Sequence, residues 1–304
     1  MAKKFEPVSI IRAEGYRYDT LRPRLERLIE NLGGWNKFLS AGDRVLIKPN
    51  LLSARPPERG VTTHPEVVRA VAESLIDFGA NPALGDSPGG AHRGVERVFK
   101  NTGMLEAASK ANIPWINFEA AGARTIDTEA GIRLHLSRAI DEYDRIVSVS
   151  KLKTHSYIQY TGAVKNLFGL VPGFRKSVYH KQYPKPGDFA RMIVEIYRNA
   201  PVDLHIMDAV VGMEGNGPAS GDTREVGLLL ASKNGFALDR TAEFIIGMPV
   251  GRSPVTETGA KLGLGPKEVS ELSFTGLDPA EVRLEKPFKL PRRLRDFMIP
   301  GALA

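Results

Sequence analysis

Four basic side chains follow one apolar stretch of the chain, at the point where a buried strand should end. After residues 145–147 (Arg-Ile-Val) come Lys151, Lys153 and His155, and Lys165 follows in the same segment. Lysine is seldom fully buried unless it is paired, and this strand is too apolar to lie at the surface. The pattern favours a site for a small anion. The alternative is a helix cap flanked by solvated lysines.

Residues 161–166 (Thr-Gly-Ala-Val-Lys-Asn) form a small-residue entry into a helix. Glycine and alanine allow close approach to the backbone, and free amides at a helix start attract anions. Lys165 adds a point charge or an amine nucleophile. We expect Asn166 beside it to contact the substrate.

Two histidines near these lysines have the chemistry for proton transfer. His155 can act as a general acid or base, because an unperturbed pKa of about 6.5 suits neutral pH and nearby lysines keep the ring neutral. The alternative is a plain hydrogen-bonding residue. His180 lies in a loop rich in proline and lysine; such a histidine is usually a surface residue, but such loops also form lids.

Carboxylates and a further histidine occur in two glycine-rich segments. The segment GDSPGGAHRG contains Asp86, Ser87 and His92, and the segment MDAVVGMEGNGP contains Asp208 and Glu214. Asp86 can hold a cation, orient a histidine or cap the next helix. Asp208 and Glu214 can bind a divalent ion, or neutralise the lysines through ion pairs. Neither segment matches a Walker loop or a dinucleotide fingerprint, so we do not predict an ordinary nucleotide or NAD enzyme.

The composition limits the classes of protein that remain. The 304 residues contain no cysteine, which excludes disulfides, thiolate-held zinc, an Fe–S cluster on this chain and a cysteine nucleophile. No apolar run approaches the roughly 18 residues of a transmembrane helix, so we expect a soluble cytoplasmic protein. The net charge of +7 mildly favours acidic partners, and no nucleic-acid-binding motif is recognisable.

Strand-like and helix-like segments alternate along the chain, which is typical of parallel strands joined by crossover helices. We expect strands at 7–13, 44–50, 82–88, 114–120, 131–137, 144–151, 203–214 and 225–232, and helices at 21–32, 63–79 and 238–246. Thr63 and Glu66 form a capping box for the second helix. The predicted fold is α/β, with a mostly parallel sheet, helices on both faces and a smaller inserted β layer.

The predicted domain organisation is one α/β domain over residues 1–275, allowing two lobes, and a basic extension over 276–304. The extension contains Arg292, Arg293 and Arg295 beside apolar residues. It reads as a solvated tail or a helix packed on a neighbour. A homo-oligomer is compatible with this organisation.

The polar residues of interest fall at predicted strand ends. In open parallel sheets, ligands bind beyond the carboxyl ends of the strands, where strand-to-helix loops gather. We therefore expect convergence there of Lys48 and Asn50, His64, Asp86 and Ser87, Lys151 to His155, and Asp208 and Glu214. The predicted substrate-binding residues are Lys48, Asn50, Ser87, Lys151, Lys153 and Asn166. A metal ion, if one is bound, would use His180, Asp86, Asp208 and Glu214.

Several motifs together resemble a known family. The strings VLIKPNLL, GDSP, KLKTH, TGAVKNLFGLVPG and DAVVGMEGNGP are similar to those of the family called domain of unknown function 362, from about residue 45 to residue 247. Many members of that family have an attached ferredoxin-like Fe–S module. This chain has no cysteine to hold one.

A fainter resemblance links the order of the basic residues to the lactate racemase family. There, two histidines exchange protons with the substrate, a lysine anchors a nickel-pincer nucleotide and a last histidine binds the metal. The resemblance implies these roles for His92 and His155, for Lys165 and for His180. Ala163 replaces a second glycine of the racemase pattern.

These observations predict an enzyme that racemises, epimerises or isomerises a small substrate bearing a carboxylate or phosphate. Lys151, Lys153 and Lys165 would fix the anion, and His155, with His92 or His180, would move a proton. The cofactor is left open between none, a divalent metal and a nickel-pincer-like nucleotide. The alternative is a non-catalytic metal- or cofactor-binding protein, or a redox partner, as the ferredoxin-linked relatives suggest.

Overall fold

A mixed, mostly parallel sheet forms the centre of the protein. The computed structural model describes residues 5–89 and 94–291. The strands of the main sheet are β1 (Val8–Arg12), β2 (Arg44–Pro49), β3 (Asn81–Asp86), β4 (Trp115–Asn117), β7 (Arg145–His155), β8 (Gln159–Thr161), β9 (Leu204–Glu214), β10 (Asp222–Ser232) and β11 (Phe274–Gly276). Their order is β11-β1-β10-β9-β7-β2-β3-β4, with β8 paired to β7. The α/β fold predicted from the sequence is confirmed.

The parallel part of the sheet is the part that positions the site. Strands β4, β3, β2, β7 and β9 all run in the same direction, so their carboxyl ends meet at one edge. Strand β10 is antiparallel to both of its neighbours, β9 and β1, whereas β1 pairs parallel with β11. Strand β8 folds back antiparallel onto the end of β7. The expected strands at 7–13 and 225–232 therefore belong to an antiparallel flank.

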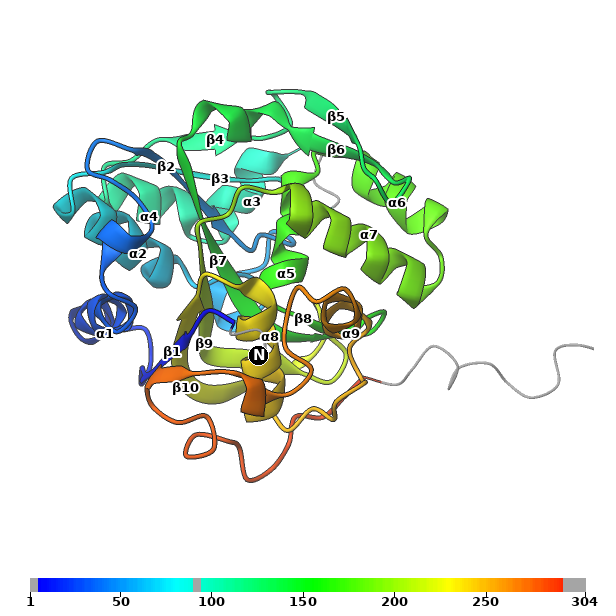
Figure 1. Cartoon of the computed structure of the whole chain (residues 1–304). Coiled ribbons are helices and arrows are strands. Elements are labelled where there is room, and N and C mark those ends of the chain that lie inside the picture. Colours follow the sequence, from blue (N-terminus) through cyan, green and yellow to red (C-terminus); the bar gives the residue numbers. More distant parts are fainter. Residues whose placement is uncertain (1–4, 90–93, 292–304) are drawn as a thin grey trace, which may run out of the picture.

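Helices cover both faces of the sheet (Figure 1). One face carries α1 (Tyr18–Glu30), α2 (Pro65–Asp77), α3 (Val95–Asn101) and α4 (Met104–Lys110); the other carries α5 (Ala163–Asn166), α7 (Pro186–Asn199) and α8 (Gly235–Ile245), with α9 (Pro254–Lys261) packed on α7 and α8. The side chains of β2 alternate between the two faces of the sheet. Val45 and Ile47 join the core under the first group of helices, and Leu46 joins the core under the second group. Successive side chains of a strand point to opposite faces.

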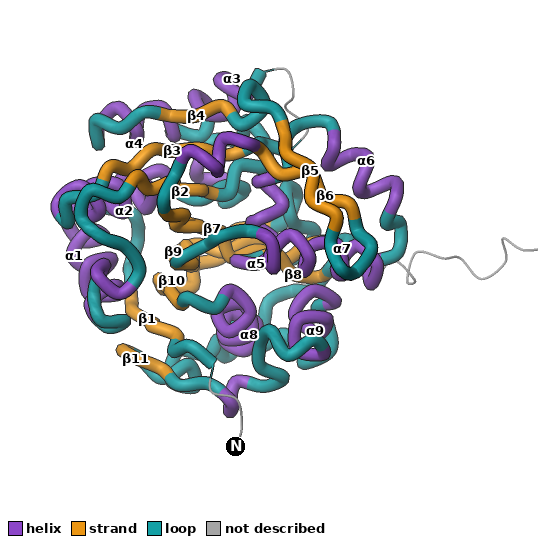
Figure 2. The backbone as a smooth tube through the Cα atoms, turned by 45° about the horizontal axis from the view of Figure 1, so that its top comes forward, coloured by secondary structure: helices purple, strands orange, loops and turns teal. Residues whose placement is uncertain are grey.

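A small second sheet matches the predicted inserted layer (Figure 2). Strands β5 (Ala123–Asp127) and β6 (Arg133–Ser137) pair antiparallel. Helix α6 (Arg175–Gln182) packs beside them, and its Tyr179 hydroxyl donates to the carbonyl of Arg133 (3.1 Å) and accepts from the amide of His135 (2.8 Å). Segment 114–120, in contrast, supplies β4 at the edge of the main sheet.

The cap of α2 differs from the predicted one. The N-cap is His64, whose Nδ1 accepts from the amide of Glu66 (3.3 Å). The Thr63 hydroxyl instead donates to the carbonyl of Val149 (2.7 Å) and accepts from the amide of Asn50 (2.9 Å). Thr63 therefore fastens the loop after β2 to β7, because a tertiary partner outcompetes the local one.

The chain beyond β11 packs onto the same core as far as it is described. Val282 and Phe288 are buried in the cluster beneath α8. The boundary near residue 275 stays a prediction, and Arg292, Arg293 and Arg295 lie outside the described residues. In the described ranges, none of the helices combines the length and apolar character needed to cross a bilayer.

Candidate functional site

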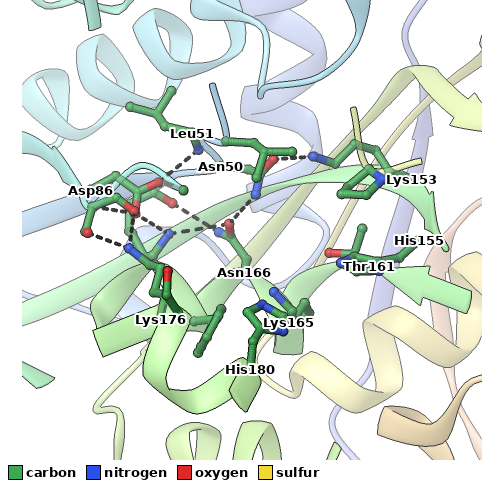
Figure 3. Close-up of a pocket in the computed structure, with 18 residues that line it drawn as sticks. Asn50, Leu51, Asp86, Lys153, His155, Thr161, Lys165, Asn166, Lys176 and His180 are labelled. Carbon is green, nitrogen blue, oxygen red and sulfur yellow. Dashed lines mark hydrogen bonds and ion pairs between the residues drawn. The ribbon is translucent and has the colours of Figure 1, made fainter. Parts of the chain in front are cut away.

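A cavity of about 330 Å³ opens at the carboxyl ends of β2, β3 and β7 (Figure 3). Nine of the predicted site residues line it: Lys48, Asn50, Asp86, Ser87, Lys153, His155, Lys165, Asn166 and His180. Residues that the sequence did not single out also line it, among them Thr161, Phe168, Gly169, Lys176 and Ser177. The predicted convergence at the rim of the sheet is therefore present for this group.

One side of the cavity is a network of ion pairs and hydrogen bonds, which we call the bonded wall: Lys48, Asn50, Asp86, Ser87, Asn166 and Lys176. At its centre Lys48 Nζ lies 2.9 Å from Asp86 Oδ1, and both side chains are buried. Asp86 also accepts from the amides of Leu51 (2.9 Å) and Ser87 (2.8 Å). Burial lowers the pKa of Lys48 and raises that of Asp86, and the attraction between the two opposes both shifts.

Gly169 makes this ion pair sterically feasible. A Cβ at position 169 would overlap Asp86 Oδ1 and Lys48 Nζ. The glycine of the TGAVKNLFGLVPG motif therefore permits a close approach, as expected from its type. The groups that lie close to the backbone of Gly169 are the side chains of the Lys48–Asp86 ion pair.

Two asparagines extend the bonded wall toward β7. Asn166 donates to Ser148 Oγ (2.9 Å) and accepts from Asn50 Nδ2 (3.2 Å). Asn50 Oδ1 in turn accepts from Lys153 Nζ (2.7 Å). Asn50 and Asn166 were predicted to contact the substrate, and they line the cavity. In the structure the side-chain amide oxygens of Asn50 and Asn166 accept hydrogen bonds from Lys153 and Lys48.

Lys153 donates two hydrogen bonds, to Asn50 Oδ1 and to the carbonyl of Val61 (2.6 Å). Burial first, and then the charges of Lys165 and Lys151, lower the pKa of Lys153 to about 7. A neutral lysine amine has two N–H bonds and one lone pair, so it can still donate both of these hydrogen bonds. Lys153 is therefore compatible with the neutral form at neutral pH.

Lys176, from α6, completes the wall and was missed in the sequence. Its Nζ donates to the carbonyl oxygen (2.7 Å) and the hydroxyl of Ser87, and that hydroxyl donates to Glu119. Burial lowers the pKa of Lys176 to about 8, opposed by Asp86 and Glu119. No local signal separates Lys176 from the other cations of its loop, because only the tertiary fold brings it to Ser87.

The opposite side of the cavity, which we call the open side, consists of His155, Thr161, Lys165 and His180 (Figure 3). Among the described residues, Lys165 Nζ has no hydrogen-bond or ion-pair partner. It lies 4.4 Å from the ring centre of Phe168. Burial, and then the charges of Lys176 and Lys48, lower the pKa of Lys165 to about 7.

The ring of His155 is held neutral with a defined tautomer. Its Nδ1 accepts a hydrogen bond from the amide of Tyr157 (3.1 Å), so in the neutral ring the proton resides on Nε2. Burial first, and then Lys165 and Lys153, keep the pKa of His155 well below its ordinary value. This arrangement makes His155 a hydrogen-bond donor through Nε2, whereas a general base needs a free ring nitrogen.

His180 stands at the mouth of the cavity. Its ring stacks on Phe189 (centroids 4.5 Å apart) and meets Phe168 edge-on (5.7 Å). Withdrawal of the ring from water, followed by the charge of Lys165, lowers the pKa of His180 to about 4. The histidine is thus a neutral, solvent-exposed group that lines the same cavity as Lys165.

The start of α5 does not offer the anion-binding amides expected from the sequence. The amides of Ala163 and Val164 donate to the two oxygens of Asp239 (2.6 and 3.0 Å). A Cβ at Gly162 would overlap Asp239 Oδ1. An internal carboxylate already satisfies this helix start, so an anion in the cavity must bind through side chains.

Lys151 belongs to a different environment, which corrects its predicted role as an anion ligand beside Lys153. The β7–β9 pairing shifts register between these two lysines, and Lys151 does not line the cavity. Its Nζ contacts Asp208 Oδ2 (2.8 Å) and Tyr16 Oη (2.7 Å). Asp208 also accepts from the amide of His64 (2.9 Å). Of the two roles expected for Asp208, a metal ligand or a partner of a lysine, the structure shows the ion pair with a lysine.

The four predicted metal ligands do not come together. Asp86 is paired within the bonded wall, Asp208 is paired with Lys151, and Glu214 accepts from Arg224 (3.0 Å). Across residues 5–89 and 94–291, no group of three or more histidine or acidic side chains could hold a metal ion. These carboxylates neutralise cations instead. His92 lies outside the described residues.

Comparisons with known proteins place the chain in a family. The family described as domain of unknown function (DUF362) matches residues 45–243. A protein of Synechocystis sp. named a thylakoid-associated protein is 39% identical over 300 residues, which cover 97% of this chain and 92% of the relative.

A solved structure gives a weaker match. The lactate racemase apoprotein of Thermoanaerobacterium thermosaccharolyticum is 12% identical with a TM-score of 0.45, covering 70% of this chain and 56% of the racemase chain. A likeness this small carries no argument about activity. The match over residues 45–243, together with the Synechocystis relative, shows that the chain belongs to the family of the domain of unknown function 362.

Proposed function

We propose that the chain is an enzyme that binds a small anionic substrate in the cavity and moves a proton at a carbon beside its carboxylate or carbonyl group. Racemases and isomerases catalyse reactions of this class. The observation that supports the proposal is the open side, where a neutral His155 lines the same cavity as Lys165, whose Nζ has no oxygen partner among residues 5–89 and 94–291. Perturbed titratable groups in a concave site are typical of catalysis.

Lys165 is the group best suited to receive the anion. The other cavity cations already donate to oxygen atoms of the protein, Lys48 to Asp86 and Lys176 to Ser87. A bound anion would favour the protonated form of Lys165 and raise its pKa from about 7. Substrate binding near neutral pH should therefore take up a proton.

Lys153 is the proposed base. Its neutral amine can keep both hydrogen bonds to Asn50 and Val61 and still have a lone pair to accept a proton, and the residue lines the cavity. A base with a pKa of about 7 is matched to neutral pH, and such general base catalysis contributes about 10²–10⁴-fold. This assignment replaces the proton-abstracting role that the sequence suggested for His155.

His155 is the proposed electrophile. Nε2–H can donate to the substrate oxygen on which negative charge develops as the proton leaves carbon. A donor held in place in a water-poor site stabilises such an enolate without reorganisation. Neutral imidazole is a known electrophile in proton transfers of this kind.

Solvent deuterium exchange tests the proposal. The protein is incubated in D₂O with 2-hydroxy, 2-amino and 2-oxo acids and with phosphorylated hydroxyketones, and NMR detects deuterium at the carbon beside the carbonyl or carboxylate. We expect exchange in one of these classes, and a loss of about 10²-fold or more in Lys153→Met. Lys289→Met, at an exposed lysine outside the cavity, is the control. Absence of exchange across all classes, or full exchange by Lys153→Met, would contradict the proposal.

The cytoplasmic location stays a proposal as well. The name of the Synechocystis relative associates that protein with thylakoids. Cell fractionation followed by a salt wash separates the two outcomes, because a peripheral protein leaves the membrane fraction at high ionic strength. Recovery only in the membrane fraction after the wash would contradict the cytoplasmic location.

A further inference from the structure

We propose that Lys165 is a nucleophilic lysine that forms an imine with a carbonyl-bearing anion, which narrows the substrate class to 2-oxo acids and related aldehydes or ketones. The proposal rests on the proposed function, because it uses the same cavity, and it replaces the ion pair between Lys165 and the bound anion by a covalent bond once the carbonyl group reacts. Its basis is a contrast between Lys165 and the other lysines that line the cavity.

The other lysines are committed to partners. Lys48 donates to the carbonyl of Pro49 (2.8 Å) and pairs with Asp86. Lys153 and Lys176 each donate to two oxygen atoms of the protein. In the part of the chain that the structure describes, Lys165 Nζ has no such oxygen partner. A cation in this position lacks the counter-charge that burial requires, so the free amine, with its lone pair exposed to the cavity, is favoured.

The surroundings of Lys165 favour the amine as well. The rings of Phe168 and Phe189 lie 4.4 and 5.7 Å from Nζ, so part of its environment is apolar. Lysines are activated as nucleophiles by desolvation and by a neighbouring cation. With a pKa of about 7, roughly half of Lys165 is free amine at neutral pH, roughly a thousandfold more than for an ordinary lysine.

The cavity provides the remaining parts of the reaction. The amine lone pair of Lys165 attacks the carbonyl carbon, so the C–N bond forms while the C=O π bond breaks, and one amine proton passes to the oxygen to give a carbinolamine. The C–O bond then breaks as the hydroxyl takes a proton from solvent and leaves as water, and the nitrogen lone pair forms the protonated imine. The atoms balance without an oxidant or reductant. His155 Nε2–H and the Thr161 hydroxyl line the same cavity and can donate to the oxygen. Hydrolysis restores the lysine.

An imine also explains how a carbon-bound proton becomes acidic enough to remove. Protonated C=N draws electrons from the adjacent carbon, and the C–H bond there can break with its electrons held in an enamine. Lys153 would accept that proton through its free lone pair. The cavity of about 330 Å³ is at the small end of ligand sites, which suits a substrate of few carbon atoms.

Reductive trapping is the experiment that tests the inference. The full chain is incubated with pyruvate and sodium cyanoborohydride, which reduces an imine to a stable carboxyethyl-lysine, and peptide mass spectrometry locates the adduct. We expect Lys165 to be labelled at least about tenfold faster than any other lysine, with the rate rising through pH 7. Lys165→Met and Lys165→Arg should both lose this label, and Lys289→Met should keep it. Circular dichroism verifies that each variant is folded.

The outcomes separate the inference from the proposed function. Labelling spread evenly over exposed lysines, or unchanged in Lys165→Arg, would overturn the imine. Deuterium exchange without an adduct at Lys165 would overturn the imine and leave the proton-transfer proposal in place. An adduct at Lys165 without exchange in any substrate class would support the nucleophile and overturn the proton transfer.

Discussion

The bonded wall and the open side of one cavity use the same residue type for opposite purposes. In the wall, Lys48 and Lys176 donate to Asp86 and Ser87. On the open side, no oxygen of the described residues pairs with Lys165. Removing one partner of a buried ion pair is destabilising, and a cation without a counter-charge costs stability even where, as at Lys165, the side chain is only partly buried. The cost suggests that Lys165 is present for a ligand.

The largest expected effect comes from breaking the wall at its central ion pair. Lys48→Met leaves the Asp86 carboxylate buried without its counter-charge, and we expect the free energy of unfolding to fall by about 3–5 kcal/mol. Urea unfolding followed by circular dichroism measures this loss.

The control for that prediction is the exposed pair of Arg44 and Asp144. Arg44→Met should change stability little, because solvent screens such pairs. Adding Asp86→Asn to Lys48→Met should recover part of the loss, since the unpaired charge is gone. If Lys48→Met lowers the free energy of unfolding by less than about 1 kcal/mol, the Lys48–Asp86 pair contributes no more than an exposed ion pair. That result would weaken the contrast between the bonded wall and the open side.

The second prediction tests whether His155, on the open side, acts as a hydrogen-bond donor or as a general base. If His155 acts through Nε2–H, then His155→Gln keeps an N–H donor and retains part of the deuterium exchange activity. His155→Phe removes the donor and should cost about 10²–10³-fold in kcat. Equal and complete loss in both variants would restore the general-base role that the sequence favoured.

The third effect concerns Gly169, which lies against the central ion pair of the bonded wall. Gly169→Ala forces a Cβ against Asp86 and Lys48, and overpacking of this kind costs about 1–3 kcal/mol. Gly187→Ala is the matched control, because a Cβ at Gly187 meets no atom within 4 Å and alanine favours the first turn of α7. Thermal melting compares the two. A melting temperature for Gly169→Ala equal to that of the wild type would contradict the close approach.

The sequence predicted where the site lies better than what each residue does there. Strand-end position was enough to place Lys48, Asp86 and His155 near one another, because parallel strands end at a common edge. Their roles depend on partners distant in sequence. Asp239, for example, accepts hydrogen bonds from the first two amides of α5. Its position in the sequence gives no sign of this contact.

The same limit explains the errors on β7. Lys151 and Lys153 are indistinguishable as strand residues of one face, and only the register shift and Asp208 separate them. The tautomer of His155 depends on a backbone amide two residues away, which residue type alone does not reveal. Lys176 reaches the cavity through the tertiary placement of α6.

The last expected effect is a gradual pH dependence of stability that isolates Lys165. Its pKa is about 7 in the folded protein and about 10.4 in an unfolded chain. Between these values the unfolded state binds more protons, so this lysine makes stability rise with pH, by at most about 1.4 kcal/mol per pH unit. Below pH 7 both states are protonated and the buried charge is fully destabilising. Lys165→Met removes this contribution.

The variant should therefore be more stable than the wild type at pH 6, and its advantage should shrink steadily toward pH 9. Urea unfolding of both proteins at each pH measures the difference, and changes in other groups cancel in the comparison. Lys289→Met, which alters an exposed lysine, should track the wild type at every pH. A difference between Lys165→Met and the wild type that stays constant with pH would mean that Lys165 keeps an ordinary pKa, and the open side would then lack the free amine on which its chemistry depends.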